Sequence, residues 1–453
     1  MGKPSARSRA AVAAGQAAGA ASRALRRGGG TTVPGVVARF IDRGVAGTLA
    51  SGLRNGCVLV SGTNGKTTTS RLISAMLSAA GRRVVHNRAG ANLMTGVTTA
   101  LLDGGGDSGL FEVDEAVLPR AIAELRPRLV LCLNLFRDQL DRYGELNTLG
   151  SKWAAGLARL PADSTVLLNA DDPLVASLGA GLGCRVAYFG LETPEQLAAL
   201  PHAADSIYCP RCGTLLEFES VHYGHLGRYR CASCGFGRPA PAFCARDIKL
   251  ALDRPTRFAV EGLELETSLP GLYNVYNVLA AVAAGLTLGL EPAVLVEAVR
   301  SLSGAFGRTE VVKIEGKRLR LFLAKNPAGF NEVIRTLLLD PAPLRLYVAL
   351  NDRIADGEDV SWIWDVDFEE LAGRCEAMVV GGTRAEDMAV RLKYAGFAPG
   401  ELVVAGSHAK GLRELLARTP AGGTAYAVPT YTAMLELRRE LAGRGVVGQF
   451  WED

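Results

Sequence analysis

Short apolar runs alternate with helical patterns along the first half of the chain. Residues 57–60 form an apolar run that predicts a buried strand, residues 62–66 predict a loop, and residues 67–80 predict a helix with one apolar face. Further strands are predicted at residues 84–85, 109–113, 129–135, 165–169 and 185–189. Strands that alternate with helices are typical of a mostly parallel, doubly wound α/β sheet.

The pattern is interrupted once and then continues in a second unit. A cysteine-bearing insertion occupies residues 200–240, and the strand-to-helix pattern resumes near Gly271. A connector around residues 304–308 leads to a second α/β unit. The strands of that unit are predicted at residues 320–324, 344–350, 377–380 and 401–405. We therefore expect three parts, namely a basic N-terminal arm (1–45), a central domain with the insertion (46–304) and a smaller C-terminal domain (305–453).

The composition indicates a folded globular protein. The chain has 453 residues, of which 48% are hydrophobic and 21% charged, which excludes a mainly disordered, collagen-like or disulfide-scaffold protein. The net charge of +4 gives no strong case for a nucleic-acid-binding protein. The longest apolar run, residues 278–290, is shorter than the ~20 residues that span a bilayer, so it predicts a buried helix. Because the N-terminus lacks the apolar segment of a signal peptide, we expect a cytosolic protein.

The N-terminal arm is basic. Residues 1–30 carry six Lys or Arg side chains and no acidic one, in a background rich in Ala and Gly. We expect a frayed helix or tail here. The alternative is an arm that contacts anionic lipid headgroups.

A glycine-rich loop follows the first predicted strand and opens a helix. The segment from Ser61 to Thr69 reads Ser-Gly-Thr-Asn-Gly-Lys-Thr-Thr-Thr, although Val60 stands where a general P-loop has its first glycine. Glycines let backbone N–H groups approach phosphates, and a helix N-terminus favours negative charge. Lys66 is expected to reach the β- and γ-phosphates, and Thr67 to offer its hydroxyl to Mg²⁺. The loop therefore predicts a nucleotide site formed by Gly62, Thr63, Asn64, Gly65, Lys66, Thr67 and Thr68.

Four cysteines form two Cys-x-x-Cys pairs in the insertion. The first pair is Cys209 and Cys212, and the second is Cys231 and Cys234. Eighteen residues separate the two pairs. Two such pairs predict a closed tetrahedral zinc site with a structural role, because four thiolates leave no open position for water. Two unrelated cysteine pairs or a redox pair are the alternative. We expect the intervening His222 and His225 on the solvent side, and we expect buried positions for Cys57, Cys132, Cys184 and Cys375.

The segment from Asp352 to Glu370 is acidic. It contains eight acidic side chains and one basic, with Trp362 and Trp364 among them, and it follows an apolar strand. Ligands bind at this edge of open α/β sheets. For Asp352, Asp356 and Asp359 we favour a functional role, because a carboxylate can orient a histidine and stabilise its charged form. Glu369, Glu370 and Asp367 are instead expected on a solvated face.

Two further segments of the C-terminal unit carry candidate residues. Lys325 and Asn326 stand at the end of a predicted strand, and both are candidate catalytic residues. Thr383, Arg384 and Asp387 are expected on another strand-to-helix loop of the same site, whereas His408 is expected to be a helix-capping neighbour.

The phosphate loop and later segments resemble the Mur ligases and folylpolyglutamate synthases. Residues 62–68, the Asn-x-x-x-Asp segment that begins at Asn134, Lys152-Trp153, and residues 169–172, 271–277 and 307–310 are similar to motifs of that family. The resemblance implies that Glu112 binds Mg²⁺ and that Asn169, Asp171, Asn274 and Arg308 lie on the nucleotide side. It implies ATP and Mg²⁺ as cofactors. It leaves open whether Lys152 is carbamylated.

The sequence also departs from the ordinary members of this family. Gln139 replaces the usual histidine, residues 321–327 depart from the motif that opens the C-terminal domain, and about 55 residues before the loop leave no room for a UDP-binding domain. Together with the cysteine insertion, residues 137–145 and 356–365 resemble the branch that provides the ligase subunit of lipid II isoglutaminyl synthase.

That resemblance implies an ATP-dependent amidation in peptidoglycan synthesis. The α-carboxylate of D-glutamate in the lipid II stem peptide would become an acyl phosphate and then D-isoglutamine, at the inner face of the membrane. Ammonia would come from a GatD-like glutamine amidotransferase subunit, whose catalytic triad Asp356 would complete. An amino-acid-adding ligase of the same fold and a zinc-ribbon ATPase that acts on nucleic acid are the alternatives, although the near-neutral charge argues against nucleic acid.

Overall fold

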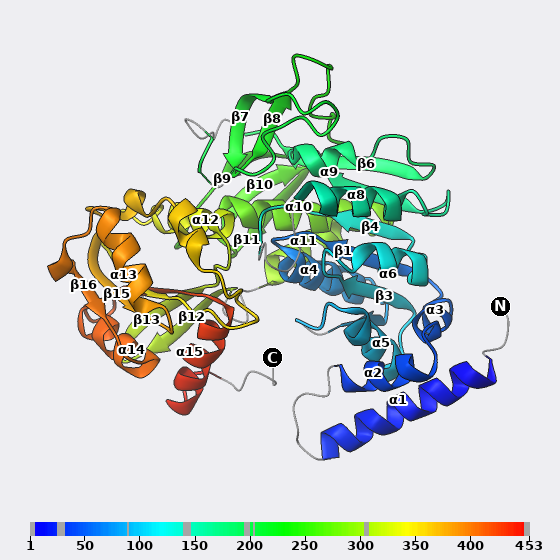
Figure 1. Ribbon diagram of the computed structural model, residues 1–453, viewed down its shortest axis with the longest axis horizontal. Coiled ribbons are helices and arrows are strands. Elements are labelled where there is room, and N and C mark those ends of the chain that lie inside the picture. Colours follow the sequence, from blue (N-terminus) through cyan, green and yellow to red (C-terminus); the bar gives the residue numbers. More distant parts are fainter. Residues whose placement is uncertain are drawn as a thin grey trace.

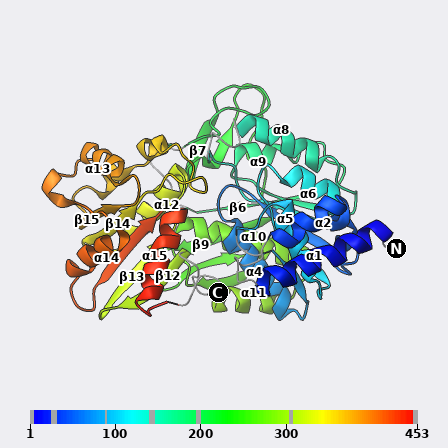
Figure 2. The same ribbon diagram turned by 60° about the horizontal axis from the view of Figure 1, so that its bottom comes forward.

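The computed structural model describes residues 5–24, 32–87, 90–138, 146–193, 200–202, 204–302 and 308–447. Among these residues, two sheets of unequal size lie in two domains side by side (Figures 1 and 2), and a separate two-stranded hairpin lies at one end of the larger domain. The hairpin consists of β7 (Glu217–Tyr223) and β8 (Leu226–Arg230).

The larger sheet has nine strands in the order β11-β10-β9-β6-β5-β4-β1-β3-β2 among the described residues. Its strands are β1 (Cys57–Ser61), β2 (Val84–His86), β3 (Ser108–Glu112), β4 (Leu129–Cys132), β5 (Thr165–Asn169), β6 (Arg185–Leu191), β9 (Phe243–Lys249), β10 (Thr256–Val260) and β11 (Leu263–Thr267). The neighbours from β2 to β9 pair in parallel, and β9, β10 and β11 form an antiparallel edge. The strand order turns back at β1, which places the segment after β1 in the crevice where such sheets bind ligands.

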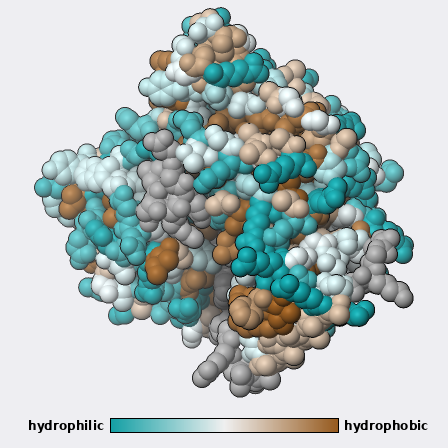
Figure 3. Space-filling view, turned by 45° about the vertical axis from the view of Figure 1, so that its right-hand side comes forward, coloured by the Kyte–Doolittle hydropathy of each residue, from teal (hydrophilic) through white to brown (hydrophobic). Residues whose placement is uncertain are grey.

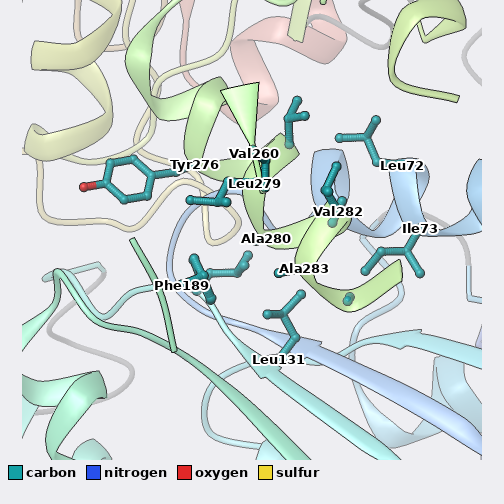
Figure 4. Close-up of a cluster of buried hydrophobic side chains, with 14 of the residues drawn as sticks. Leu72, Ile73, Leu131, Phe189, Val260, Tyr276, Leu279, Ala280, Val282 and Ala283 are labelled. Carbon is teal, nitrogen blue, oxygen red and sulfur yellow. The ribbon is translucent and has the colours of Figure 1, made fainter. Parts of the chain in front are cut away.

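Helices cover both faces of the larger sheet. One face carries α4 (Lys66–Ala79), α10 (Leu272–Thr287) and α11 (Pro292–Ser301). The other face carries α3 (Val45–Ala50), α5 (Met94–Asp103), α6 (Leu118–Leu125), α8 (Leu146–Leu157) and α9 (Pro173–Ser177). Figure 4 shows the first of these cores, in which Leu72 and Ile73 of α4 and Leu279 of α10 pack with Leu131 of β4.

The smaller sheet has the order β12-β13-β17-β14-β15-β16. Its strands are β12 (Arg308–Ile314), β13 (Lys317–Phe322), β14 (Leu344–Ala349), β15 (Cys375–Gly381), β16 (Leu402–Val404) and β17 (Thr424–Pro429). Packed on one face are α12 (Pro327–Leu337) and α13 (Ala385–Tyr394), and on the other α14 (His408–Ala417) and α15 (Tyr431–Gly443). Short 3₁₀ helices occupy Ser361–Asp365, Phe368–Leu371 and Pro399–Glu401.

The structure confirms the doubly wound α/β class and corrects several elements. The predicted strands at residues 165–169 and 344–350 are close to β5 and β14, but the strand expected at residues 129–135 ends at Cys132. The smaller sheet has two strands that the sequence did not predict, β12 and β17. β12 begins at Arg308, inside the expected connector, and mixes charged with apolar residues because it pairs only with β13 at the sheet edge. β17 contains small alanine residues, which give a weak apolar signal.

The apolar run at residues 278–290 belongs mainly to α10, where residues 278–284 are fully buried. This confirms the predicted core helix. No helix in the described ranges is long and apolar enough to cross a membrane. Of the connector expected at residues 304–308, residues 304–307 lie outside the described residues, and Arg308 begins β12.

The N-terminal segment is a docked helix, which corrects the expected frayed tail for residues 6–24. α1 (Ala6–Ala24) packs against α2 (Val33–Ile41), and both lie on the side of the larger domain away from the smaller one (Figures 1 and 2). The side chains of Ala11, Ala38 and Leu102 are buried between α1, α2 and α5. Small residues allow this close approach, and the helix is therefore held by packing, not left in solvent.

Candidate active site

A cavity of about 380 Å³ lies between the two domains. Residues of the glycine-rich loop, of the segments after β3 and β4, of α10, of α12 and of α15 line it. The cavity lies beyond the carboxyl end of β1, where the fold predicts ligand binding.

The glycine-rich loop is fixed by the segment after β4. The backbone N–H of Asn64 donates to the Asn134 side chain at 2.8 Å, and the Asn134 amide donates back to the Asn64 carbonyl at 3.1 Å. Thr63 adds a bond from its backbone N–H to the Asn134 carbonyl. Gly65 has a φ of +90°, and a Cβ there would lie 2.0 Å from the Asn277 side-chain oxygen, so the loop requires glycine at this position. These contacts fix the loop so that the N-terminus of α4 faces the cavity.

Lys66 forms a buried ion pair at the first residue of α4. Its Nζ lies 3.0 Å from Glu115 and donates to the Gly62 carbonyl at 2.5 Å. Burial raises the pKa of Glu115, and the charge of Lys66 opposes that rise. Because Lys66 is held by Glu115 and the Gly62 carbonyl, an arriving phosphate would compete with Glu115 for the ammonium group.

Acidic side chains line the cavity beside the loop. Glu112 ends β3, and Asp114 and Glu115 follow it; all three are buried and line the cavity. The backbone N–H of Glu112 donates to the side-chain oxygen of the buried Asn87 at 2.9 Å. This bond fixes the end of the strand. Oxygen donors clustered beside a phosphate loop are the ligands that Mg²⁺ prefers.

The C-terminal domain closes the cavity through two contacts beside the loop. Asn326, the residue that caps α12, donates from its amide to the Asn64 side chain at 3.1 Å, and the Asn64 amide lies 3.4 Å from the Asn326 oxygen. Lys325 forms an ion pair with Asp138. Both Lys325 and Asp138 line the cavity.

Two family models match the chain. The Mur ligase middle domain matches residues 60–285, and the MurT ligase C-terminal domain matches residues 323–434. The chain is 36% identical to a lipid II isoglutaminyl synthase (glutamine-hydrolyzing) subunit MurT of Streptococcus pneumoniae, over 93% of this chain and 94% of that protein. A Staphylococcus aureus protein of the same name is 34% identical over the same shares.

The chain belongs to the MurT family of Mur ligases.

Solved structures agree on the fold. A pseudomurein peptide ligase type C from Methanothermus fervidus aligns with a TM-score of 0.67 and 22% identity, over 88% of this chain and 80% of that one. A folylpolyglutamate synthase of Mycobacterium tuberculosis, complexed with ADP, aligns with a TM-score of 0.61 and 16% identity, over 89% and 95%. At these identities the likeness concerns the Mur ligase fold alone.

The structure brings most of the predicted site residues of this MurT-family chain to the cavity. The predicted residues that line it are Thr63, Asn64, Gly65, Lys66, Thr67, Thr68, Glu112, Asn274 and Lys325. Gly62 lies behind the loop, where a Cβ would lie 2.8 Å from Leu133. Asn326 reaches the site through Asn64. Asp114, Glu115 and Tyr223 also line the cavity and were not predicted. For the first two, the available signal was an acidic pair shortly after the strand that ends at Glu112.

Two predicted nucleotide-side residues lie elsewhere. Asn169 donates to the Leu133 carbonyl at 2.9 Å, and Asp171 is fully buried between Arg238 and the Tyr276 hydroxyl. Neither lines the cavity, because each satisfies buried polar groups at the strand ends. Lys152 is exposed on α8 and does not line the cavity either. Gln139 and the Arg308 side chain lie outside the described residues.

The tip of the β7–β8 hairpin forms part of the cavity wall through Tyr223. The two histidines beside it were expected on the solvent side, and the structure corrects this. His222 and His225 are buried, with exposed fractions of 3% and 0%. The His225 ring packs against Phe136 in a tilted arrangement, with ring centres 4.5 Å apart, and lies 3.4 Å from Asp172. The turn between the strands inserts toward the segment after β4, so its polar side chains are removed from solvent.

The four cysteines of the insertion come together. Their Sγ atoms all lie within 4.8 Å of one another, and the Cys209–Cys234 and Cys212–Cys231 pairs are 3.5 Å apart. Gly213 and Gly235 adopt positive φ angles and close each turn by a bond to the carbonyl of the first cysteine. The four thiols could hold a metal ion. Of the other cysteines expected to be buried, Cys57 and Cys132 are buried, whereas Cys184 and Cys375 are only half-buried.

The acidic segment after β14 does not expose all its carboxylates. Asp356 is 4% exposed and accepts hydrogen bonds from the backbone and hydroxyl of Thr432, at the start of α15. Burial raises the pKa of Asp356, and these bonds oppose the rise. Asp352 accepts from Thr383 at 2.8 Å and pairs with Arg384, and Asp359 accepts from the Ser361 N–H.

Three other residues predicted in the C-terminal unit, Arg384, His408 and Asp367, have polar partners in the structure. Arg384 also pairs with Asp387, so the loop after β15 meets Asp352, but Thr383, Arg384 and Asp387 do not line the cavity that Lys325 lines, contrary to the expectation. His408 begins α14 and lies between the Tyr347 hydroxyl at 2.8 Å and Glu436 at 2.9 Å. Asp367, expected on a solvated face, is only half-exposed and accepts from Asn331.

Proposed function

We propose that this chain is the ligase subunit of a two-subunit lipid II isoglutaminyl synthase. ATP phosphorylates the α-carboxylate of D-glutamate in the lipid II stem peptide, which gives an acyl phosphate and ADP. Ammonia then attacks the acyl carbon and expels phosphate, which leaves the D-isoglutamine amide. The observation that carries the proposal is the identity to MurT subunits over 93% of this chain, through both domains.

The cavity residues have distinct proposed roles. Lys66 and the loop N–H groups bind the phosphates of ATP, and Asn274 lies on the nucleotide side. Thr67 and Glu112 hold Mg²⁺, which neutralises phosphate charge when bound. Lys325 and Asn326 act near the acyl phosphate, and Arg308 supplies a further cation. The roles of Lys66, Thr67, Glu112, Asn274 and Lys325 are supported by their place in the lining of one cavity, and that of Asn326 by its contact with Asn64. The role of Arg308 rests on the resemblance alone.

A structural zinc ion is proposed in the insertion. The donors Cys209, Cys212, Cys231 and Cys234 are all thiols, and their spacing is near the roughly 3.8 Å that separates sulfurs around tetrahedral zinc. Four thiolates leave no position for water, so the ion would stabilise the hairpin.

The proposed partner is a GatD-like glutaminase that releases ammonia from glutamine. The relatives are named as subunits of a glutamine-hydrolyzing synthase, which supports a separate glutaminase chain. Asp356 is proposed to orient a histidine of that partner. The lipid-linked substrate would place the reaction at the inner face of the cytoplasmic membrane.

The deciding experiment is reconstitution with the glutaminase. The purified pair is incubated with lipid II, ATP, Mg²⁺ and glutamine, and the stem peptide is followed by mass spectrometry. We expect a carboxyl-to-carboxamide change that requires every component, that disappears with Lys66→Ala and that persists with Lys410→Ala, a change of an exposed lysine on α14. Incorporation of an added amino acid without amidation would contradict the proposal and favour an amino-acid-adding ligase.

A further inference from the structure

An apolar stripe on α2 faces solvent. Val33, Val36 and Phe40 are 48%, 52% and 89% exposed, and their spacing of three and four residues places them on one face of the helix. Figure 3 shows hydrophobic surface low on this face of the molecule, in the region where Figure 1 places α1 and α2. An exposed Phe beside two exposed Val residues is costly in water unless something covers it.

The opposite face of α2 is held firmly. Arg39 forms a paired contact with Glu124 of α6, at 2.7 and 2.9 Å. The Gly35 N–H donates to the Thr99 hydroxyl of α5 at 2.9 Å, and a Cβ at Gly35 would lie 1.9 Å from the Thr95 carbonyl. The stripe is therefore presented on a fixed platform.

The surroundings of the stripe are basic. The first 45 residues carry eight Lys or Arg and one acidic residue, a net charge of +7, so residues 46–453 must carry −3 of the total of +4. Arg7, Arg9 and Arg43 are exposed, Arg43 follows α2 closely in the chain, and Arg7 donates to the Ile41 carbonyl at the end of α2, at 2.6 Å. The single acid, Asp42, is engaged by the Ser8 hydroxyl and the Gly44 N–H.

The stripe is also joined to the active-site cavity by one helix. α2 packs on α5, and Leu93, directly before α5, is 47% exposed and lines the cavity. A bilayer that contacts α2 is therefore linked to one edge of the cavity through α5, although α2 itself lies on the side of the larger domain away from the smaller one.

We propose that the exposed face of α2, with the basic residues around it, docks this chain on an anionic lipid bilayer. The apolar stripe enters the headgroup region and the arginines neutralise lipid phosphates, a combination typical of interfacial helices. The inference rests on the proposed function in one respect, since a lipid-linked substrate gives the docking its purpose. The near-neutral net charge does not oppose it, because the positive charge is concentrated at the N-terminal end.

The test is flotation of the full-length chain with vesicles of phosphatidylcholine, with and without phosphatidylglycerol. We expect binding to the anionic vesicles only. Phe40→Ser should weaken binding about tenfold. Arg9→Glu with Arg43→Glu should weaken it by at least about 25-fold, at about fivefold for each of the two removed positive charges. Leu215→Ser, which changes another exposed apolar residue on the insertion, should bind as the unchanged chain does.

Activity separates this inference from the proposed function. Amidation of a water-soluble stem peptide should be the same in all these variants, while amidation of lipid II in anionic vesicles should fall with vesicle binding. Equal binding to neutral and anionic vesicles, or unchanged binding by Phe40→Ser, would overturn the docking proposal and leave the amidation proposal intact. A change in sedimentation mass or in glutaminase association by Phe40→Ser would show that the stripe is a protein interface, which also overturns it.

Discussion

The hydroxyl of Tyr223 accepts a hydrogen bond of 3.0 Å from the side-chain amide of Asn64. Tyr223 ends β7 in the cysteine insertion, and Asn64 lies in the phosphate loop. Because the Asn64 amide group also meets Asn326, one side chain joins the insertion, the loop and the C-terminal domain. The insertion is therefore part of the cavity wall and not a separate appendage.

Tyr223→Phe should slow amidation while the fold is retained. The ring stays in place, but the Asn64 amide loses a buried acceptor, and we expect kcat to fall roughly threefold to tenfold, the range of one hydrogen bond. The matched control is Tyr229→Phe, which removes the hydroxyl bonded to the Ala170 carbonyl in the same hairpin. That variant should lower Tm with kcat nearly unchanged. Equal effects of the two variants on kcat would contradict a positioning role for Tyr223.

Removing one cysteine ligand should remove the metal. Cys231→Ser should yield protein without bound zinc by elemental analysis, with a lower Tm, because a three-thiolate site holds the hairpin poorly. Cys184→Ser changes a half-buried cysteine outside the cluster and should keep both the metal and Tm. Retention of stoichiometric zinc by Cys231→Ser would show that the four thiols do not form the site.

Asp356→Asn should separate the two nitrogen sources. If Asp356 serves the glutaminase, amidation with glutamine should fall by at least about a hundredfold while amidation with added ammonium salt stays near its original rate. Because Asp356 also bonds Thr432 near the cavity, the ammonium assay is essential. Glu370→Gln, which changes an exposed acidic residue of the same segment, should leave both rates unchanged. Loss of both rates in Asp356→Asn would assign the residue to the structure of α15 instead.

Because Glu332 is buried, the free energy of unfolding should fall as pH rises. Burial raises the pKa of Glu332 to about 7, against the opposing charge of Arg335. The folded state therefore binds more protons than the unfolded state between about pH 4.5 and 7, and the free energy of unfolding should fall across that window, by up to about 3 kcal/mol. Glu332→Gln should flatten this dependence in denaturant titrations.

The control for Glu332 is an exposed pair of the same spacing. Glu297 and Arg300 on α11 form an i,i+3 ion pair at 2.6 Å with both side chains largely in solvent. Glu297→Gln should leave the pH dependence of stability unchanged. An unchanged slope in Glu332→Gln would mean that Glu332 is charged in the folded protein at every pH in the window.

The sequence predicted the features that depend on local pattern. The loop at residues 62–68 and the four cysteines have fixed spacing and a direct chemical meaning, and the structure brings each set together. Long-range burial was not predictable in the same way. His222 and His225 lie in a hairpin of polar and aromatic residues, and its sequence pattern does not indicate which surface it packs against. Asp171 is paired with Arg238, which comes from a distant segment of the chain. Tyr223 meets Asn64 only because the insertion folds back over the loop.

The two contacts that join the domains beside the cavity differ in their response to salt. The pair of amides from Asn64 and Asn326 carries no net charge, so added ions have little to screen. The ion pair of Lys325 and Asp138 is partly open to solvent at its lysine end and is weakened as ionic strength rises. One contact thus yields to salt while the other persists, and the ligase should keep its two domains together over a wide range of ionic conditions.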